Sequence, residues 1–537
     1  MTSPYTQIST RQTPQTQPIP GPVGARQVPN SAGGFVFAVD RWTRLQRFLI
    51  LGTEGGSYYA SEQKLTADNA KVVFECVAED GLRVVDILTD ISTTSRAPKV
   101  QPTLLALAIC AAADDKAVRE ATFAAMPKIC RTATHLFMWV GYVKQFRGTG
   151  SQGIMNAISK WYMDREPGQA AYQIVKYRSR EGYTHRDILR IAHPKPDDSG
   201  TGRTFASLFN WTTKNVPIPE ADQDALSPVI GFEQLQAAES GKDAAKILRD
   251  RPGLPWETVK PDHQNEPEVW HAILDAGMPY NALVRQLPRL TRLGVTTARK
   301  ADIVGRLRDP EVIAKSRIHP FALLLATVTY AQGQGRGGRD WTPEAQVVDA
   351  LNDAFYLAFG NVQPANKRTL LALDVSGSMD GSYIAGTLMS ARVASSAMAL
   401  VTAATEPDYT TMAFCREFVH LPISPRQRMD DVLAMTNRLP FGGTDCALPL
   451  TWALKNKVLV DTVVIYTDNE SWAGPIHVTQ ALDNYRQATG LPTRLIAVGM
   501  TATRYTVADP NDTGSMDVTG FDAAAPNLIA GFSRGEF

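Results

Sequence analysis

The stretch Leu371-Ala-Leu-Asp-Val-Ser-Gly-Ser-Met379 is the most informative part of this sequence for the fold. An apolar run from Leu370 to Leu373 ends abruptly at Asp374, Ser376 and Ser378. Continuous apolar runs are typical of buried parallel strands. Ligands of open α/β sheets lie beyond the carboxyl ends of such strands. The stretch therefore predicts a first strand that brings three oxygen donors to the edge of a sheet.

Two later stretches carry matching chemistry. Phe441-Gly-Gly-Thr-Asp-Cys446 offers Thr444 and Asp445 on a glycine-rich turn, and Val463-Val-Ile-Tyr-Thr-Asp468 is an apolar strand that ends in an acid. An isolated D-x-S-x-S also fits a strand end capped by polar turn residues, but three such pieces in order favour a cation site. Two carboxylates and three hydroxyls suit one Mg²⁺ ion that keeps a position open to water or to a partner's oxygen. The predicted ligands are Asp374, Ser376, Ser378, Thr444 and Asp468.

The chain around these stretches alternates between strand and helix patterns, which predicts a doubly wound parallel sheet with helices on both faces. The predicted strands are 369–374, 409–418, 460–468 and 494–499. The predicted helices lie near 388–405, 426–437, 448–457 and 478–488.

Residues from about 34 to 360 show one helical pattern after another and few strand signals. The segment from Thr132 to Phe146 is typical, because its apolar residues fall on one helical face. Such a series of helix pairs predicts an α-solenoid. No clean sequence period is present, so a plain helical bundle stays the alternative. We expect a flexible tail at 1–30, a helical domain at 31–362 and the sheet domain at 363–537.

Composition excludes several classes of protein. The 537 residues carry a net charge of +1, so any electrostatic argument must be local. The five cysteines are scattered and form no C-x-x-C pair, which argues against a disulfide scaffold or zinc site and fits a reducing, cytoplasmic compartment. The start shows no secretory pattern and no run of about 18 apolar residues occurs, so neither secretion nor a membrane span is expected.

One local charge excess does occur. Between Lys128 and Lys195 the chain has twelve Lys and Arg residues against four Asp and Glu, interleaved with aromatic residues. Solvated helix faces would explain such charges, but the near-neutral chain favours a patch that binds phosphates and stacks unpaired bases. Thr184 and Asp187 predict a helix start that places His185 and Arg186 in its first turn. The predicted RNA-binding residues are Lys128, Arg131, His135, Lys144, Arg147, Lys160, Lys176, Arg178, Arg180, His185, Arg186 and Lys195. Of these, we expect Lys128, Arg131 and His135 to share one helical face.

These pieces resemble two known patterns. The five predicted ligands match the metal-ion-dependent adhesion site of von Willebrand factor A domains. The whole chain from about residue 33 to 531 resembles the Ro autoantigen family, whose helical part is the TROVE module and whose bacterial members are called Rsr. The motifs that carry this resemblance are Ala32-Gly-Gly-Phe-Val36, Arg47-Phe-Leu-Ile-Leu-Gly52, Lys176-Tyr-Arg-Ser-Arg180, Tyr183-Thr-His-Arg-Asp187, His319-Pro320, Asp374-Val-Ser-Gly-Ser-Met379, Gly442-Gly-Thr-Asp-Cys-Ala-Leu-Pro449 and Tyr466-Thr-Asp-Asn-Glu470.

The resemblance implies a ring of HEAT-type helical repeats closed by the von Willebrand factor A-like domain. It implies binding of small noncoding Y RNA on the outer basic surface, with His185 as an RNA contact, and of single-stranded RNA 3′ ends in the central hole. It also implies work with exoribonucleases, notably polynucleotide phosphorylase, in RNA decay and ribosomal RNA maturation.

Three hypotheses follow for the function. The first is a non-enzymatic RNA-binding ring, and the second is an adhesion-type scaffold in which a partner's carboxylate completes the Mg²⁺ shell. The third is a metal-dependent nuclease or phosphatase, which the sequence disfavours. Two-metal nucleases need several convergent acids, and here Asp374 and Asp468 are surrounded by hydroxyls. We therefore expect no catalytic residues.

Overall fold

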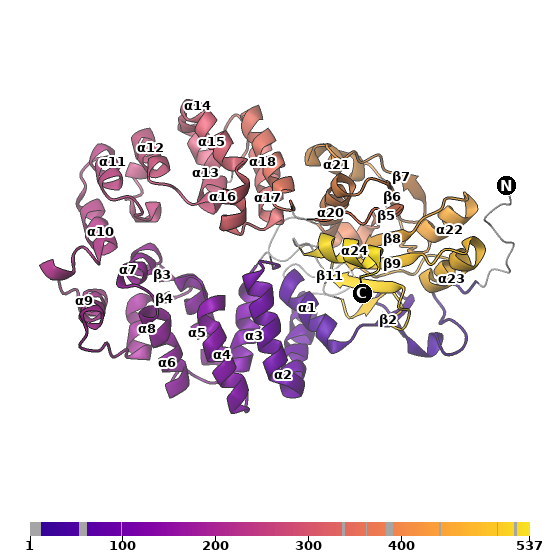
Figure 1. The fold of residues 1–537 in the computed structure, drawn as a ribbon, viewed down its shortest axis with the longest axis horizontal. Helices are drawn as coiled ribbons and strands as arrows, with labels where there is room; N and C mark the ends of the chain where they lie inside the picture. The colour runs from indigo at the N-terminus through magenta and orange to yellow at the C-terminus, as the bar shows by residue number, and fades with distance from the viewer. Residues whose placement is uncertain are drawn as a thin grey trace.

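The structure is a computed structural model that describes residues 12–52, 62–97, 99–335, 339–360, 362–382, 390–439, 442–501, 503–519 and 524–536, with backbone only for 62–69. In Figure 1 the helices form an arc whose two ends both meet one α/β domain. The chain is therefore a ring of helical repeats closed by a sheet domain, as expected.

The arc is built from two layers of helices. In one layer α2 packs on α4, α4 on α6 and α6 on α8, while α3 packs on α5 in the other. This stepwise packing is typical of a solenoid rather than a bundle. The helices are α1 (Arg41–Leu51), α2 (Glu62–Thr93), α3 (Gln101–Ala111), α4 (Lys116–Ile129), α5 (Ala133–Phe146), α6 (Gln152–Met163), α7 (Pro167–Lys176), α8 (His185–Ala192), α9 (Gly200–Lys214), α10 (Ser227–Ala237), α11 (Gly241–Asp250), α12 (Pro267–Asp275), α13 (Tyr280–Arg292), α14 (Val295–Ala298), α15 (Lys300–Leu307), α16 (Pro310–Ser316), α17 (Pro320–Ala331) and α18 (Ala345–Leu357).

Local sequence signals explain where these helices begin and end. The Asp40 side chain accepts a hydrogen bond from Thr43 N at the start of α1, and Gly52 ends that helix with a φ of 68°. Thr132 caps α5 in the same way, by accepting from His135 N. A short hairpin of β3 (Ser179–Arg180) and β4 (Tyr183–Thr184) leads from α7 into α8.

The sheet domain has six strands in the order β11-β9-β8-β5-β6-β7, and β7 alone runs antiparallel to its neighbour. Every residue of β5 and β8 is buried, which explains their continuous apolar runs. Helices α20 and α24 pack on one face, and α22 and α23 lie with the core of the other face. The strands are β5 (Thr369–Asp374), β6 (Tyr409–Phe414), β7 (Phe418–His420), β8 (Thr462–Thr467), β9 (Arg494–Gly499) and β11 (Ser515–Thr519). The helices are α19 (Gly377–Gly381), α20 (Ala391–Thr405), α21 (Met429–Thr436), α22 (Leu448–Lys455), α23 (Val478–Thr489) and α24 (Ala525–Arg534).

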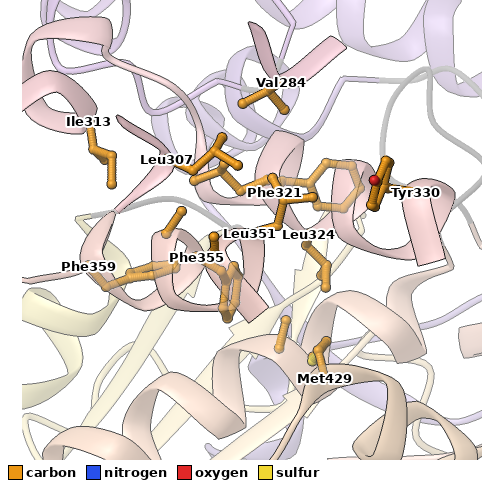
Figure 2. Close-up of a cluster of buried hydrophobic side chains, with 14 of the residues drawn as sticks. Val284, Leu307, Ile313, Phe321, Leu324, Tyr330, Leu351, Phe355, Phe359 and Met429 are labelled. Carbon is orange, nitrogen blue, oxygen red and sulfur yellow. The ribbon is translucent and has the colours of Figure 1, made fainter. Parts of the chain in front are cut away.

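The last helices of the arc share a core with the sheet domain. Figure 2 shows Leu324, Leu351 and Phe355 of the arc beside Met429 of α21. The Tyr356 hydroxyl also donates to the Gln427 carbonyl across this junction, at 2.8 Å.

Among the described residues, no single helix has the length and apolar character needed to cross a bilayer. Helices α16 and α17 pass that test only together, with a bend of 113° between them.

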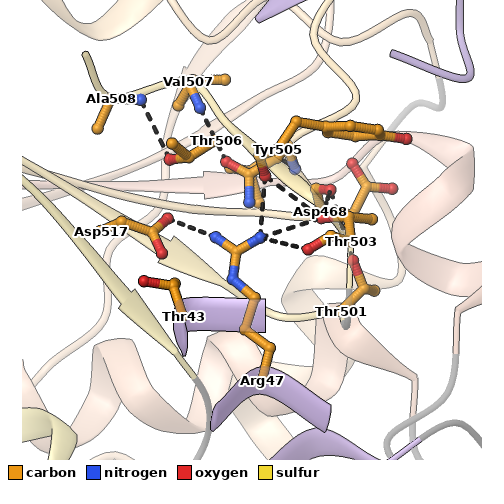
Figure 3. Close-up of polar contacts among 12 residues, drawn as sticks. Thr43, Arg47, Asp468, Thr501, Thr503, Tyr505, Thr506, Val507, Ala508 and Asp517 are labelled. Atoms are coloured by element: carbon orange, nitrogen blue, oxygen red, sulfur yellow. Dashed lines mark hydrogen bonds and ion pairs between the residues drawn. The ribbon is translucent and has the colours of Figure 1, made fainter. Parts of the chain in front are cut away.

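The first helix of the arc is joined to the sheet domain by Arg47, which is fully buried. Its guanidinium donates to the carbonyl oxygens of Thr503 and Tyr505, at 2.7 and 2.9 Å, and pairs with Asp517 (Figure 3). A buried charge needs such partners, so Arg47 fixes the position of α1 on the sheet domain. Both ends of the arc are thus attached, which closes the ring.

The prediction of a flexible tail at 1–30 is wrong for the described residues 12–30. Thr13 and Gln15 are buried, and Gln15 Nε2 donates to Asp445 Oδ1 and to the Ile476 carbonyl, at 2.7 and 2.9 Å. Further on, β1 (Gln27–Pro29), β2 (Phe35–Ala38) and β10 (Tyr505–Thr506) form a second sheet. The chain up to Ala38 packs with the sheet domain, so the helical arc itself begins at α1. Residues 1–11 lie outside the described chain.

The physical reason is that this segment is ordered by hydrogen bonds to another domain. Its polar composition predicts that it cannot build a core of its own, which is correct. The sheet domain instead supplies the partners, for example Gln480, whose Oε1 accepts from Thr13 N at 3.0 Å. Composition carries no information about such partners several hundred residues away.

Candidate metal site and RNA-binding surface

The five predicted metal ligands all lie at the carboxyl edge of the sheet. Asp374 ends β5, Asp468 follows β8, and Ser376 immediately precedes the short helix α19. The hydroxyls of Ser376 and Ser378 lie 3.0 Å apart. All five side chains are buried, so the structure brings them into the interior of this edge.

The two carboxylates carry a charge that burial disfavours. Burial, with the charge of Asp468 second, raises the pKa of Asp374 to about 7, and burial raises the pKa of Asp468. Asp374 accepts from Ser376 N and from the Thr467 hydroxyl, at 2.9 and 2.7 Å. Oδ2 of Asp468 and the Thr444 hydroxyl have no hydrogen-bond partner among the described residues. These oxygens fit a divalent cation, which would balance the paired charges and fill the unused acceptor positions.

Asp445 follows Thr444 but belongs to a different network. Its Oδ1 accepts from Ala447 N and from Gln15 Nε2, at 3.0 and 2.7 Å. The Ser471 hydroxyl donates to Gln15 Oε1 at 2.6 Å, so Gln15 connects the turn at Thr444 with the loop after Asp468. The N-terminal segment therefore packs against two of the loops that supply the candidate ligands.

The predicted RNA-binding residues lie on α4 to α8, on the hairpin, in the linkers between them and, for Lys195, just after α8, on one arm of the ring. Lys176 is half-buried and pairs with Glu257 at 3.5 Å, and it is the one member of the set with a carboxylate partner among the described residues. The others that are exposed therefore have charges free to meet phosphate groups. These exposed members are Lys128, Arg131, Lys144, Arg147, Lys160, Arg178, Arg180, Arg186 and Lys195.

The set is divided between two sides of the arc. Lys160 and Arg186 lie on α6 and α8, which occupy the outer side in Figure 1. Arg178 and Arg180 lie at the hairpin, which with α7 is on the side toward the opposite arm. The structure thus gathers these cations along one arm without placing all of them on one face.

His185 lies in the first turn of α8, as predicted, but its side chain is not on the surface where an RNA contact needs it. Its ring is buried, Nδ1 lies 2.7 Å from the Tyr162 hydroxyl, and the ring packs edge-on against Phe137. Burial lowers the pKa of His185 to about 3, so the ring is neutral and inaccessible to a phosphate group. The capping box of Thr184 and Asp187 is present as predicted, and His185 lies on the buried face of the helix that it starts. Arg186 beside it is exposed.

The prediction that Lys128, Arg131 and His135 share one helical face is also wrong. Helix α4 ends at Ile129 and α5 begins at Ala133, so Arg131 lies in the link between them. Arg131 Nη1 donates to the Ser92 carbonyl at 2.7 Å. His135 is half-buried, and burial, with the charge of Arg131 second, lowers its pKa to about 4. His135 is therefore neutral at physiological pH.

One feature of the surface was missed from sequence. The Arg178 guanidinium lies 4.6 Å from the ring centroid of Phe232 and 5.9 Å from that of Trp211. Trp211 Nε1 donates to Glu233 at 2.8 Å, which fixes the indole. These aromatic residues lie on α9 and α10, outside the basic stretch, so spacing along the chain gave no signal for the cluster.

Comparison with known proteins agrees with this architecture. Residues 28–226 and 234–336 match the TROVE domain family model, and residues 368–533 match that of the Ro60 vWA domain. The RNA-binding protein RO60 of Deinococcus radiodurans is 42% identical over 522 residues, covering 95% of this chain and 96% of that protein. That of Caenorhabditis elegans is 35% identical over 583 residues, covering 95% and 90%.

A solved structure shares the fold. The crystal structure of the Deinococcus radiodurans RO (RSR) protein aligns with a TM-score of 0.70 at 40% sequence identity. The alignment covers 93% of this chain and all of that one.

Proposed function

We propose, from the premise that this chain belongs to the TROVE-domain Ro60 family, that it is an RNA-binding ring protein. The relatives named above are RNA-binding proteins. The observation that carries the proposal is the group of exposed cations on α4 to α8 that lack carboxylate partners among the described residues. Exposed cations of this kind bind phosphates by releasing counterions.

The finer proposal concerns two classes of RNA. A structured small RNA of the Y type binds the outer cations, represented by Lys160 and Arg186. A single-stranded 3′ end of misfolded or unprocessed RNA enters the ring, past the hairpin that carries Arg178 and Arg180. The division of the cations between two sides of the arc supports this assignment. The protein would then act in cytoplasmic RNA quality control, decay or ribosomal RNA maturation, with polynucleotide phosphorylase or another exoribonuclease as partner.

We propose that Mg²⁺ is bound by Asp374, Ser376, Ser378, Thr444 and Asp468. When bound, the ion would balance two buried carboxylates and join the ends of β5 and β8 to the turn at Thr444. The adhesion-type scaffold is less well supported, because all five side chains are buried. The N-terminal segment also packs on the neighbouring loops. A partner's carboxylate would have to displace part of this packing.

We propose no catalytic role for the protein. Among the described residues, no group of three or more His, Cys, Asp or Glu side chains is placed to hold a metal. A two-metal nuclease needs such convergent acids. Labelled single-stranded RNA incubated with the protein and Mg²⁺ is expected to be bound stoichiometrically. Multiple-turnover cleavage would contradict this part of the proposal.

The RNA-binding surface is tested by charge reversal. The double variant Lys160→Glu/Arg186→Glu should weaken binding of a stem-loop RNA by about a hundredfold, because two favourable phosphate contacts become repulsive. The matched control is Lys242→Glu/Lys246→Glu, which makes the same change in net charge on exposed residues of α11. Fluorescence anisotropy titrations give the affinities. Equal losses in the two variants would show that only net charge matters and would overturn the assignment.

A further inference from the structure

We propose that a groove between α2, α3 and α4 is a docking site for a basic amphipathic helix of a partner protein. The groove has a volume of about 680 Å³. It lies in the arc, apart from the hairpin and α8, and has a different chemistry from the RNA-binding surface.

The groove exists because α2 is bent. Its backbone leaves the helical conformation at Asp80, where φ is −153° and ψ is 82°. Gly81 follows, and a Cβ atom there would lie 2.6 Å from Val118 Cγ2, so only glycine allows this approach of α2 to α4. Arg83 N donates to Asp80 Oδ1 at 3.0 Å, which caps the second half of α2. The bend is therefore held in place by specific residues, and the groove is preformed.

The apolar rim of the groove is unusually exposed. Phe74 is 47% exposed and Leu82 is 46% exposed. Both belong to the short set of large hydrophobic residues that are more than a third exposed in the described chain. Phe146, 38% exposed, packs edge-on against Phe74 with 5.8 Å between ring centroids, which extends the apolar surface beyond the groove. Clustered exposure of this kind marks an interaction surface, whereas single exposed residues do not.

The acidic residues that line the groove favour a positively charged partner. Glu79, Asp80, Asp114 and Asp115 line it, and no Lys, Arg or His is among its lining residues. Two cations beside the groove have acid partners: Arg41 pairs with Glu79 at 2.7 Å, which balances that carboxylate, and Lys116 lies 3.5 Å from Glu120.

Arg119 is engaged too, because it donates to the carbonyls of Ala113 and Asp114. An acidic groove of this kind repels RNA and attracts a positively charged partner.

These features together indicate the form of the ligand. An amphipathic helix places apolar residues at i, i+3, i+4 and i+7 into a hydrophobic groove while its other face meets the rim. Here Phe74 and Leu82 would meet the apolar face, and the carboxylates of Asp80, Asp114 and Asp115 would meet Lys or Arg side chains beside it. The volume also falls within the range of preformed ligand sites.

The test uses a fluorescein-labelled synthetic peptide that forms an amphipathic helix with Leu on one face and Lys on the other. The full-length protein is titrated into this peptide. Anisotropy should show saturable binding, while a peptide with Glu in place of Lys should not bind. Leu82→Ser and Asp114→Lys should each weaken binding of the Lys peptide about tenfold, since each removes one of the two attractions. RNA affinity should stay unchanged in both variants.

Two matched variants make the result decisive. Leu528→Ser alters another exposed leucine, and Asp224→Lys makes the same charge change on another exposed acid. Both should bind the Lys peptide as the wild type does. Absent binding, or equal losses in the groove and control variants, would overturn the proposal. A dimer in light scattering that Asp114→Lys dissociates would also overturn it, because the occupant would then be a second copy of this chain.

Discussion

At the metal site the charged groups are buried against one another, whereas on α4 to α8 most of the cations are exposed and lack carboxylate partners among the described residues. Buried charge has a high free-energy cost unless it is balanced, so Asp374 and Asp468 are poised for a cation. Exposed, unpaired charge has little effect on folding stability and a large effect on binding a polyanion. Under the proposed function, the same type of interaction would serve stability in one region and recognition in the other.

The largest effect that would test this contrast is stabilisation by Mg²⁺. A ligand that binds only the folded state at about a hundred times its Kd raises the free energy of unfolding by about 3 kcal/mol. We expect this gain for the wild type when Mg²⁺ replaces EDTA, measured by urea titration. Asp468→Asn should abolish the gain, while RNA affinity should stay within about twofold, because the phosphate contacts are elsewhere.

A matched variant separates metal binding from local damage. Asp461→Asn changes an acid that pairs with Arg368 at the start of β8 and not at the metal edge. It should keep the full response to Mg²⁺. The same small response to Mg²⁺ in the wild type and in Asp468→Asn would mean that the buried carboxylates hold no ion.

Much of the fold could be predicted from sequence because it depends on local patterns. Strands β5 and β9 have the predicted ends, since apolar runs are encoded within a few residues. The predicted metal ligands lie at one sheet edge for the same reason: parallel strands bring their carboxyl ends together. The packing of residues 12–30 could not be predicted, because Gln15 and its partner Asp445 are 430 residues apart.

The proposed RNA-binding surface was harder to predict, because exposure depends on which side of each helix meets its neighbours. His185 is the clearest example. Ile188, Leu189 and Ala192 are buried on the same face of α8, at spacings of three, four and seven residues from His185. This apolar pattern could have revealed that the ring points inward. The cluster of Arg178 with Trp211 and Phe232 had no such signal, since it joins three separate elements.

The second-largest expected effect is a pH dependence of folding stability caused by the buried His185. The folded state keeps His185 neutral down to pH about 3, whereas the unfolded chain takes up a proton near the ordinary value of 6.5. As far as His185 is concerned, the free energy of unfolding is therefore highest above about pH 6.5 and falls as the pH is lowered below that value. Between about pH 7.5 and pH 5, His185 alone should lower the free energy of unfolding by about 2 kcal/mol.

His185→Gln should remove that part of the pH dependence, measured as the change in unfolding free energy from urea titrations. His193→Gln, at an exposed position just beyond α8, is the control and should keep the wild-type dependence. RNA affinity of the wild type should not follow the titration of His185. A rise in affinity on acidification that His185→Gln abolishes would show that the ring binds RNA as a cation, against its observed burial.

The smallest effect separates the two ways in which an exposed cation can bind RNA. Arg178 lies against Phe232 and Trp211, which orients its guanidinium plane for stacking on an unpaired base. Arg178→Lys keeps the charge and loses the plane, so affinity for single-stranded RNA should fall about fivefold, or about 1 kcal/mol, with an unchanged salt slope. Arg190→Lys, on an exposed arginine of α8 for which the structure shows no aromatic partner among the described residues, should leave affinity unaltered. If Arg178→Lys binds as the wild type does, Arg178 acts only as a phosphate contact, and the aromatic cluster serves only to pack α9 against α10.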